Sequence, residues 1–174
     1  DYQVELTVPD DYMVWATGVL ENPDSHYQPH ILKRINQARA SDSVIQIVRE
    51  QDVEQEEVVS GNTSWTYTAS DVPDFAFAVS KKYRWDATSV DLEKSDRQRV
   101  FVSAIYGEDP KMFQHAADMG RKVIQTFSDG LMPFAYPYPE MTVFSGSTGM
   151  EFPMMVNQFD SENYEMLMAV TAHE

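Results

Sequence analysis

Short strand-like segments recur through the first 106 residues, and they constrain the fold more than any other feature. Residues 2–20 alternate apolar and polar side chains in two runs around Pro9-Asp10-Asp11, which predicts an antiparallel hairpin. Runs rich in β-branched and aromatic residues predict further strands at 44–48, 65–68, 75–79, 83–90 and 99–106. The last two are predicted to pair, linked by the polar run 91–96. This part of the chain is therefore expected to be rich in β-structure.

Helical patterns are fewer and come mostly in the second half. A helix is predicted to begin at Pro29, because proline suits a first helical position, and to end at Ser41-Asp42. The acidic run 50–57 is expected to be a surface loop or a helical turn. A long amphipathic helix is predicted after Pro110, with Gly130 at its C-terminal end.

The last segment predicts one more helix. Short polar side chains at 160–163 can accept hydrogen bonds from the free N–H groups of a first turn. The apolar positions Leu167, Val170 and Ala172, with methionines between them, predict a helix that is buried on most sides.

Composition excludes several classes of protein. The 174 residues carry a net charge of −15, which argues against nucleic-acid and anionic-membrane partners. No apolar run approaches the roughly 20 residues that span a bilayer, and the absence of cysteine excludes disulfides and cysteine nucleophiles. A hydrophobic content of 43% is enough to form a core.

Two short groups of residues near the end of the chain carry the chemistry. His173-Glu174 matches the first half of H-E-x-x-H, the zinc-peptidase signature in which His binds the metal and Glu acts as general base. Glu151, just after Gly149, is a carboxylate that could bind a free α-ammonium group by a charge-assisted hydrogen bond. Two simpler interpretations stay open: a surface His-Glu pair, and an edge-strand carboxylate that discourages aggregation.

The runs YPYPEMTVFSGSTGMEFPMMVN and VTAHE resemble the zinc aminopeptidases of the aminopeptidase N type, within the gluzincin metallopeptidases. In that family a Gly-x-Met-Glu-Asn strand precedes H-E-x-x-H by a similar distance, and Gly149-Met150-Glu151 matches it. The departures are Thr148, where the family usually has Gly, and Phe152-Pro153, where it usually has Asn. Residues 71–78 are similar to a strand late in the family's N-terminal module.

The resemblance implies an α+β fold in two parts. Residues 1–94 would be the C-terminal part of an antiparallel β-sandwich, and residues 95–174 would begin a thermolysin-like mixed α/β catalytic domain. Because the chain opens directly on a strand pattern at Asp1, an upstream segment is expected to have been removed.

The resemblance also implies a reaction and a role for each site residue. A zinc ion would be held partly by His173, Glu174 would be the catalytic base, and Glu151 with Gly149 and Met150 would bind peptide substrates that have a free N-terminus. The remaining zinc ligands and the oxyanion-stabilising tyrosine would lie beyond residue 174, so the isolated chain is expected to be inactive.

Two other functions stay open: a non-catalytic β-rich interaction module, and a degenerate, inactive family member. The sequence predicts a soluble protein, with a periplasmic or extracellular-facing location as one option. It leaves the residue specificity and the oligomeric state undetermined.

Overall fold

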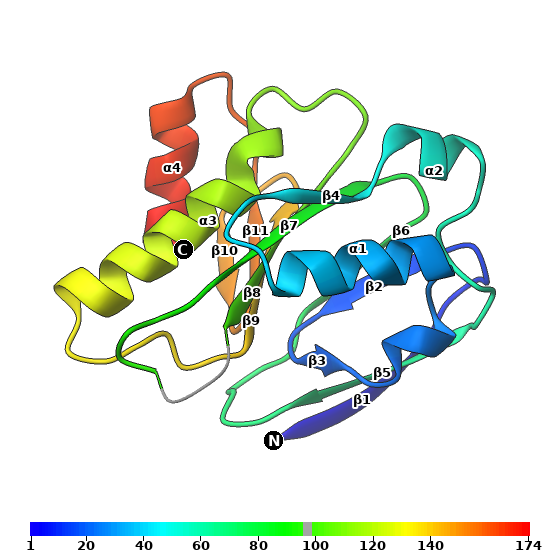
Figure 1. The fold of residues 1–174 in the computed structure, drawn as a ribbon, viewed down its shortest axis with the longest axis horizontal. Helices are drawn as coiled ribbons and strands as arrows, with labels where there is room; N and C mark the ends of the chain where they lie inside the picture. Colours follow the sequence, from blue (N-terminus) through cyan, green and yellow to red (C-terminus); the bar gives the residue numbers. More distant parts are fainter. Residues whose placement is uncertain (96–98) are drawn as a thin grey trace.

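A mixed six-stranded sheet forms the centre of the molecule in a computed structural model that describes residues 1–95 and 99–174 (Figure 1). Its strand order is β10-β11-β9-β8-β7-β4. The bounds are β4 Ile45–Val48, β7 Arg84–Val90, β8 Val100–Tyr106, β9 Glu140–Ser145, β10 Met150–Phe152 and β11 Met155–Gln158. β7 and β8 are antiparallel, which confirms the predicted pair, whereas β8 and β9 are parallel. The chain is therefore α+β with a mixed sheet.

Two smaller sheets come from the N-terminal part. β1 (Tyr2–Thr7), β5 (Ser64–Ala69) and β3 (Val19–Leu20) form one, and β2 (Met13–Ala16) and β6 (Phe77–Ser80) form the other. The predicted hairpin of residues 2–20 is wrong, since β1 pairs with β5 and β2 with β6. All four residues of β2 are buried, whereas β1 keeps exposed side chains. β2 therefore lies in the core, and β1 lies at the edge of its sheet.

The helices follow the predicted positions, with two differences in detail. α1 (Pro29–Arg39) is confirmed, and α2 (Glu50–Glu54) is the helical alternative for the acidic run. The long helix consists of a 3-10 turn, η2 (Phe113–His115), then α3 (Ala116–Gln125), then a π-helical turn, η3 (Thr126–Leu131). Gly130 lies inside η3 and not after the helix end, so its predicted role is wrong. The remaining elements are η1 (Pro23–Ser25) and α4 (Tyr164–His173).

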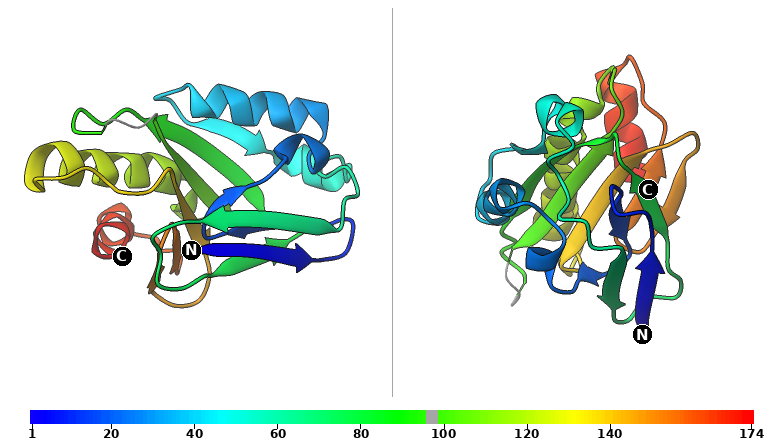
Figure 2. Two further views of the ribbon diagram at one scale, coloured as in Figure 1. Left: turned by 90° about the horizontal axis from the view of Figure 1, so that it is seen from below. Right: turned by 90° about the vertical axis from the view of Figure 1, so that its right-hand side faces the viewer.

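Alternating side chains of β8 contact two separate core clusters. Phe101 and Ile105 belong to the cluster that contains α1, β2 and Trp85. Val102 and Ala104 belong to the cluster that contains α3 and Leu167 of α4. Because side chains alternate along a strand, α1 and α3 cover opposite faces of the sheet. The helix α3 connects the parallel strands β8 and β9, and α4 packs beside it (Figures 1 and 2).

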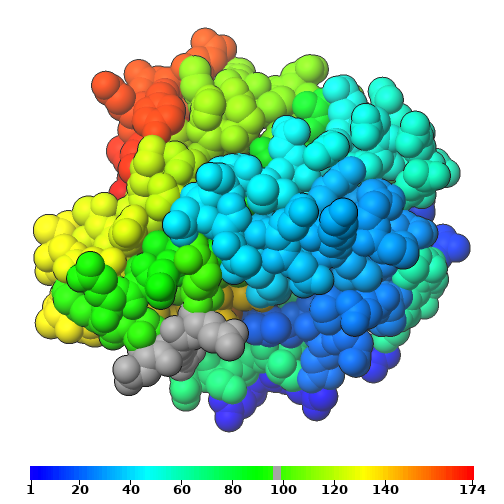
Figure 3. All heavy atoms as spheres, viewed as in Figure 1, coloured from blue at the N-terminus to red at the C-terminus, as the bar shows by residue number. Residues whose placement is uncertain are grey.

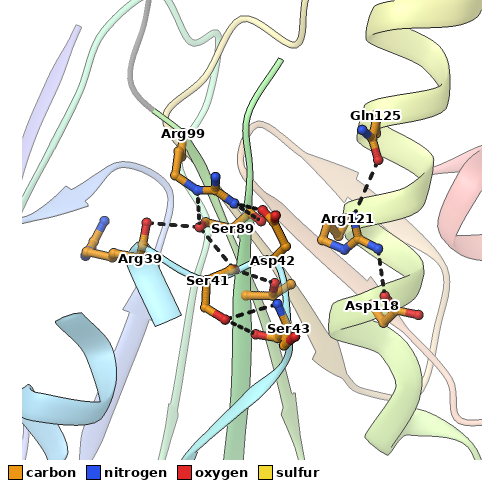
Figure 4. A network of polar contacts seen from close by, with 10 residues as sticks. Arg39, Ser41, Asp42, Ser43, Ser89, Arg99, Asp118, Arg121 and Gln125 are labelled. Carbon is orange, nitrogen blue, oxygen red and sulfur yellow. Dashed lines mark hydrogen bonds and ion pairs between the residues drawn. The ribbon is translucent and has the colours of Figure 1, made fainter. Parts of the chain in front are cut away.

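Contacts cross the predicted boundary between residues 94 and 95. Besides the β7–β8 pairing, Arg99 donates a hydrogen bond of 2.7 Å to Ser89 and forms an ion pair with Asp42 (Figure 4). The Ser89 hydroxyl donates in turn to the carbonyl of Arg39 at 2.9 Å. The central sheet therefore takes strands from both sides of this boundary, and the division into two domains stays a prediction.

No helix in the described ranges has both the length and the apolar composition needed to cross a membrane.

Candidate active site

The strand β10 lies at an exposed edge of the central sheet. Among the described strands it pairs only with β11, in an antiparallel register that sets Glu151 opposite Val156. Gly149 precedes the strand, and Gly149, Met150 and Glu151 are all exposed. An edge strand with exposed backbone groups can pair with an extended peptide.

The loop before β10 is held by Asn157 of β11. The Asn157 side-chain amide donates to the Thr148 hydroxyl at 3.4 Å. Its Oδ1 packs so closely on Gly146 that a Cβ there would lie 1.8 Å away. A side chain at 146 would therefore force the Asn157 amide to move, and Gly146 allows the close contact between this amide and the segment that leads to Gly149.

The helix α4 begins as its sequence predicts but is less buried than expected. The Asn163 side chain caps it by accepting a 3.0 Å hydrogen bond from the backbone N–H of Met166. Only Leu167 and Thr171 of the helix are buried, and Met166 is 51% exposed. The prediction of a helix buried on most sides is wrong, because among the described residues only one face packs, mainly against α3. Figure 3 shows α4 standing at one end of the molecule beside α3.

The end of α4 meets the start of β10. A Cβ added at Gly149 would lie 2.6 Å from Oε1 of Glu174, so this carboxyl group lies directly against the Gly149 backbone. Burial raises the pKa of the Glu174 carboxyl, and the hydrogen bond with Glu151 and the charge of Glu151 raise this pKa further. The His173 charge opposes the shift in this pKa. Oε2 of Glu174 is buried without a hydrogen-bond partner.

The contact of Glu174 with Gly149 and Glu151 therefore brings the two predicted groups, residues 149–151 and 173–174, together in space. Gly149, Glu151 and Glu174 are in contact, and His173 is near enough to act on Glu174 electrostatically. Met150 is 44% exposed on β10. Among residues 1–95 and 99–174, no three His, Cys, Asp or Glu side chains are arranged to hold a metal ion.

An apolar groove of about 430 Å³ runs beside the end of α4. One wall is the last turn of the helix with His173 and Glu174, and the others come from α3, η3, residues 132–137 and Met141 of β9. Phe134 in this groove is 63% exposed. The sequence interpretation missed the groove, although the apolar run Leu131-Met132-Pro133-Phe134 after a helix was a signal for it.

The sequence interpretation also missed a polar pair in the core. Gln158 of β11 and Thr171 of α4 have 0% and 1% exposure and are hydrogen-bonded to each other. A polar residue at a buried strand position and another on the buried face of a helix were the available signals.

Comparison with known proteins relates this arrangement to one group of enzymes. No protein-family model and no curated protein matches the chain. Among solved structures, a mutant of a two-domain M1 zinc metallopeptidase bound to L-arginine matches with a TM-score of 0.52 and 18% identity. The same type of mutant bound to L-tryptophan matches with a TM-score of 0.50 and 18% identity. Each match covers 98% of this chain and 33% of the solved chain.

The chain is similar in fold to one third of an M1 zinc metallopeptidase. At 18% identity the similarity concerns the fold alone, so activity and ligands do not follow from it.

Proposed function

We propose that this chain is part of a zinc-dependent aminopeptidase that removes N-terminal residues from peptides. Residues 1–94 would belong to an N-terminal β-sandwich domain and residues 95–174 would begin a thermolysin-like catalytic domain. The observation that carries the proposal is the contact of Glu174 with Gly149 and Glu151, since a helix end and a strand edge distant in sequence bring together the groups that such a reaction needs.

The residues present fit part of a zinc site. His173 offers an imidazole, and the buried Oε2 of Glu174 beside it has no protein partner. A catalytic zinc site needs three protein ligands, and the described residues supply no such set. His173 would be one ligand, and the others would come from residues of a longer protein. Zinc bound there would supply a Lewis acid that polarises the peptide carbonyl.

Each carboxylate has a separate task in the proposed reaction. Glu174 accepts the proton of the attacking water as general base. Glu151, exposed on the edge strand, binds the α-ammonium group of the substrate by a charge-assisted hydrogen bond. The peptide would lie along β10, where Gly149 has no side chain to obstruct it and Met150 would contact it.

The test uses the longer protein of which this chain would be a part, called the full-length protein below, and an aminoacyl-anilide substrate. Glu151→Gln is expected to lower kcat/KM by about 100-fold or more, because a charge-assisted contact to the amine is lost, while the zinc content stays unchanged. Glu165→Gln, on the exposed first turn of α4, is the matched control and should keep full activity. Equal loss of activity and zinc in Glu151→Gln would contradict the amine-binding role. A full-length protein with neither zinc nor hydrolysis would favour the inactive family member.

A further inference from the structure

One buried polar pair joins α4 to β11. The Gln158 amide donates to the Thr171 hydroxyl at 3.1 Å, and this hydroxyl donates to the Leu167 carbonyl at 2.9 Å. Gln158 is one of the largest fully buried side chains of the described chain. A buried amide costs free energy unless it is hydrogen-bonded, so the pair favours only one placement of the helix on the strand.

The position of this pair relates it to the candidate active site. Glu174, the C-cap residue of α4, follows Thr171 by three positions, and this spacing places two residues on the same side of a helix. On the strand side, the backbone carbonyl of Gln158 accepts a 2.8 Å hydrogen bond from the backbone N–H of Gly146, at the start of the loop that leads to Gly149. Gln158 thus contacts both segments that meet at Glu174.

Apolar contacts alone would define this placement poorly. Leu167 and Thr171 are the only buried residues of α4, and Leu167 packs in the core cluster of α3. Met168 of α4 is half-buried against the same cluster, but apolar contacts are non-directional and allow a helix to slide or rotate, whereas a hydrogen bond of fixed geometry does not.

We propose that Gln158 and Thr171 are positioning residues that hold α4 in register with β11 and so bring Glu174 to Gly149 and Glu151. For its catalytic consequence this inference rests on the proposed function. The placement itself does not, and it can be measured in the 174-residue chain.

The test compares two substitutions of Thr171 by NMR. Thr171→Val keeps the shape and removes the hydroxyl, whereas Thr171→Ser keeps the hydroxyl. The readout is the nuclear Overhauser effect between the α-protons of Gly149 and the γ-protons of Glu174. We expect this signal in the natural chain and in Thr171→Ser. In Thr171→Val we expect the signal to be lost, while the amide chemical shifts of β7 and β8 remain those of the folded chain. An unchanged signal in folded Thr171→Val would overturn the proposal.

A second variant covers the case in which Thr171→Val does not fold. Replacing both polar partners, in Gln158→Leu with Thr171→Val, leaves no unsatisfied group and should fold. We again expect the Gly149–Glu174 signal to be lost, and its retention would overturn the proposal.

The catalytic consequence is measured in the full-length protein. Thr171→Val is expected to lower kcat at least 10-fold with little change in KM, because the base is misplaced while substrate binding remains, and Thr171→Ser should restore kcat. A simultaneous, equal rise in KM would contradict positioning of Glu174. Loss of the NMR signal in a protein whose natural form has no peptidase activity would refute the proposed function and leave the positioning role intact.

Discussion

The carboxyl group of Glu174, at the end of α4, lies against the backbone of Gly149 at the start of β10. A Cβ at position 149 would lie 2.6 Å from Oε1 of Glu174, closer than van der Waals contact allows. The two residues are 25 positions apart in sequence, and only the packing of α4 beside the sheet edge brings them together. This contact makes position 149 a sensitive probe of the site.

Gly149→Ala is expected to move the Glu174 carboxyl group without unfolding the chain. The atom in the way is the far end of a flexible side chain, so the free energy of unfolding should change by less than about 1 kcal/mol. The chemical shift of the Glu174 carboxyl carbon should change clearly. Gly130→Ala, where an added Cβ meets nothing within 4 Å, is the control and should leave this shift unaltered. A Glu174 signal that is the same in both variants would contradict the contact.

Glu151→Gln is expected to lower the pKa of the Glu174 carboxyl towards its ordinary value. The substitution removes the charge of Glu151 and its hydrogen bond as a carboxyl group, two of the causes that raise this pKa. A carboxyl group whose pKa is raised in the folded state stabilises that state at low pH, and this stabilisation is lost as the pH rises through the raised pKa. Because the shift is smaller in the variant, its free energy of unfolding should fall less between low and neutral pH. Carbon-13 NMR titration measures the pKa, with Glu165→Gln as the control. A Glu174 pKa that does not fall would show that the two carboxyl groups do not interact.

Asp86→Asn is expected to stabilise the protein at pH 8. Asp86 is 3% exposed, and burial raises its pKa from 3.8 to about 6 against the opposing hydrogen bond from Tyr106 and charge of Arg84. The free energy of unfolding of the natural chain therefore falls by about 3 kcal/mol as the pH rises from about 4 through about 6. The Asn variant can still accept the 2.6 Å hydrogen bond from Tyr106 and lacks this loss.

Urea denaturation at pH 4, 6 and 8 measures the Asp86 effect. The gain in free energy of unfolding should be largest at pH 8 and near zero at pH 4. Asp74→Asn, at an exposed position, is the control and should show no such trend. Oδ1 of Asp86 is buried without a partner, so an Asp86→Asn variant that is less stable than the natural chain at pH 8 would mean that the unpaired amide N–H costs more than the buried charge.

The 174-residue chain is expected to bind no stoichiometric zinc after dialysis. His173 would be one ligand of a site that needs three, and the part of the chain with described coordinates offers no complete set. Metal analysis by mass spectrometry measures the zinc content, and His173→Ala should not change it. One tightly bound zinc per chain would show that the metal site is misassigned.

Local patterns determined the elements of this protein. Pro29 predicted the start of α1, and runs of β-branched and aromatic residues predicted the β7–β8 pair. The cluster of short polar residues at 160–163 predicted the start of α4, where Asn163 is the cap. These features depend on neighbours within a turn or a strand. The sequence also offered Gly149, Met150, Glu151, His173 and Glu174 as candidates, through a family resemblance that is specific only in the last forty residues.

Only the tertiary structure decided how these elements pair and which faces they bury. The alternation in residues 2–20 specifies two strands, but it does not say that β1 joins β5 and β2 joins β6, because partner choice depends on burial against distant residues. The apolar composition of α4 does not say that just Leu167 and Thr171 are buried. The Gln158–Thr171 pair and the contact of Glu174 with Gly149 join residues far apart in sequence. Their geometry exists only after the chain has packed, since long-range contacts are set by the shape of the whole core and not by local preference.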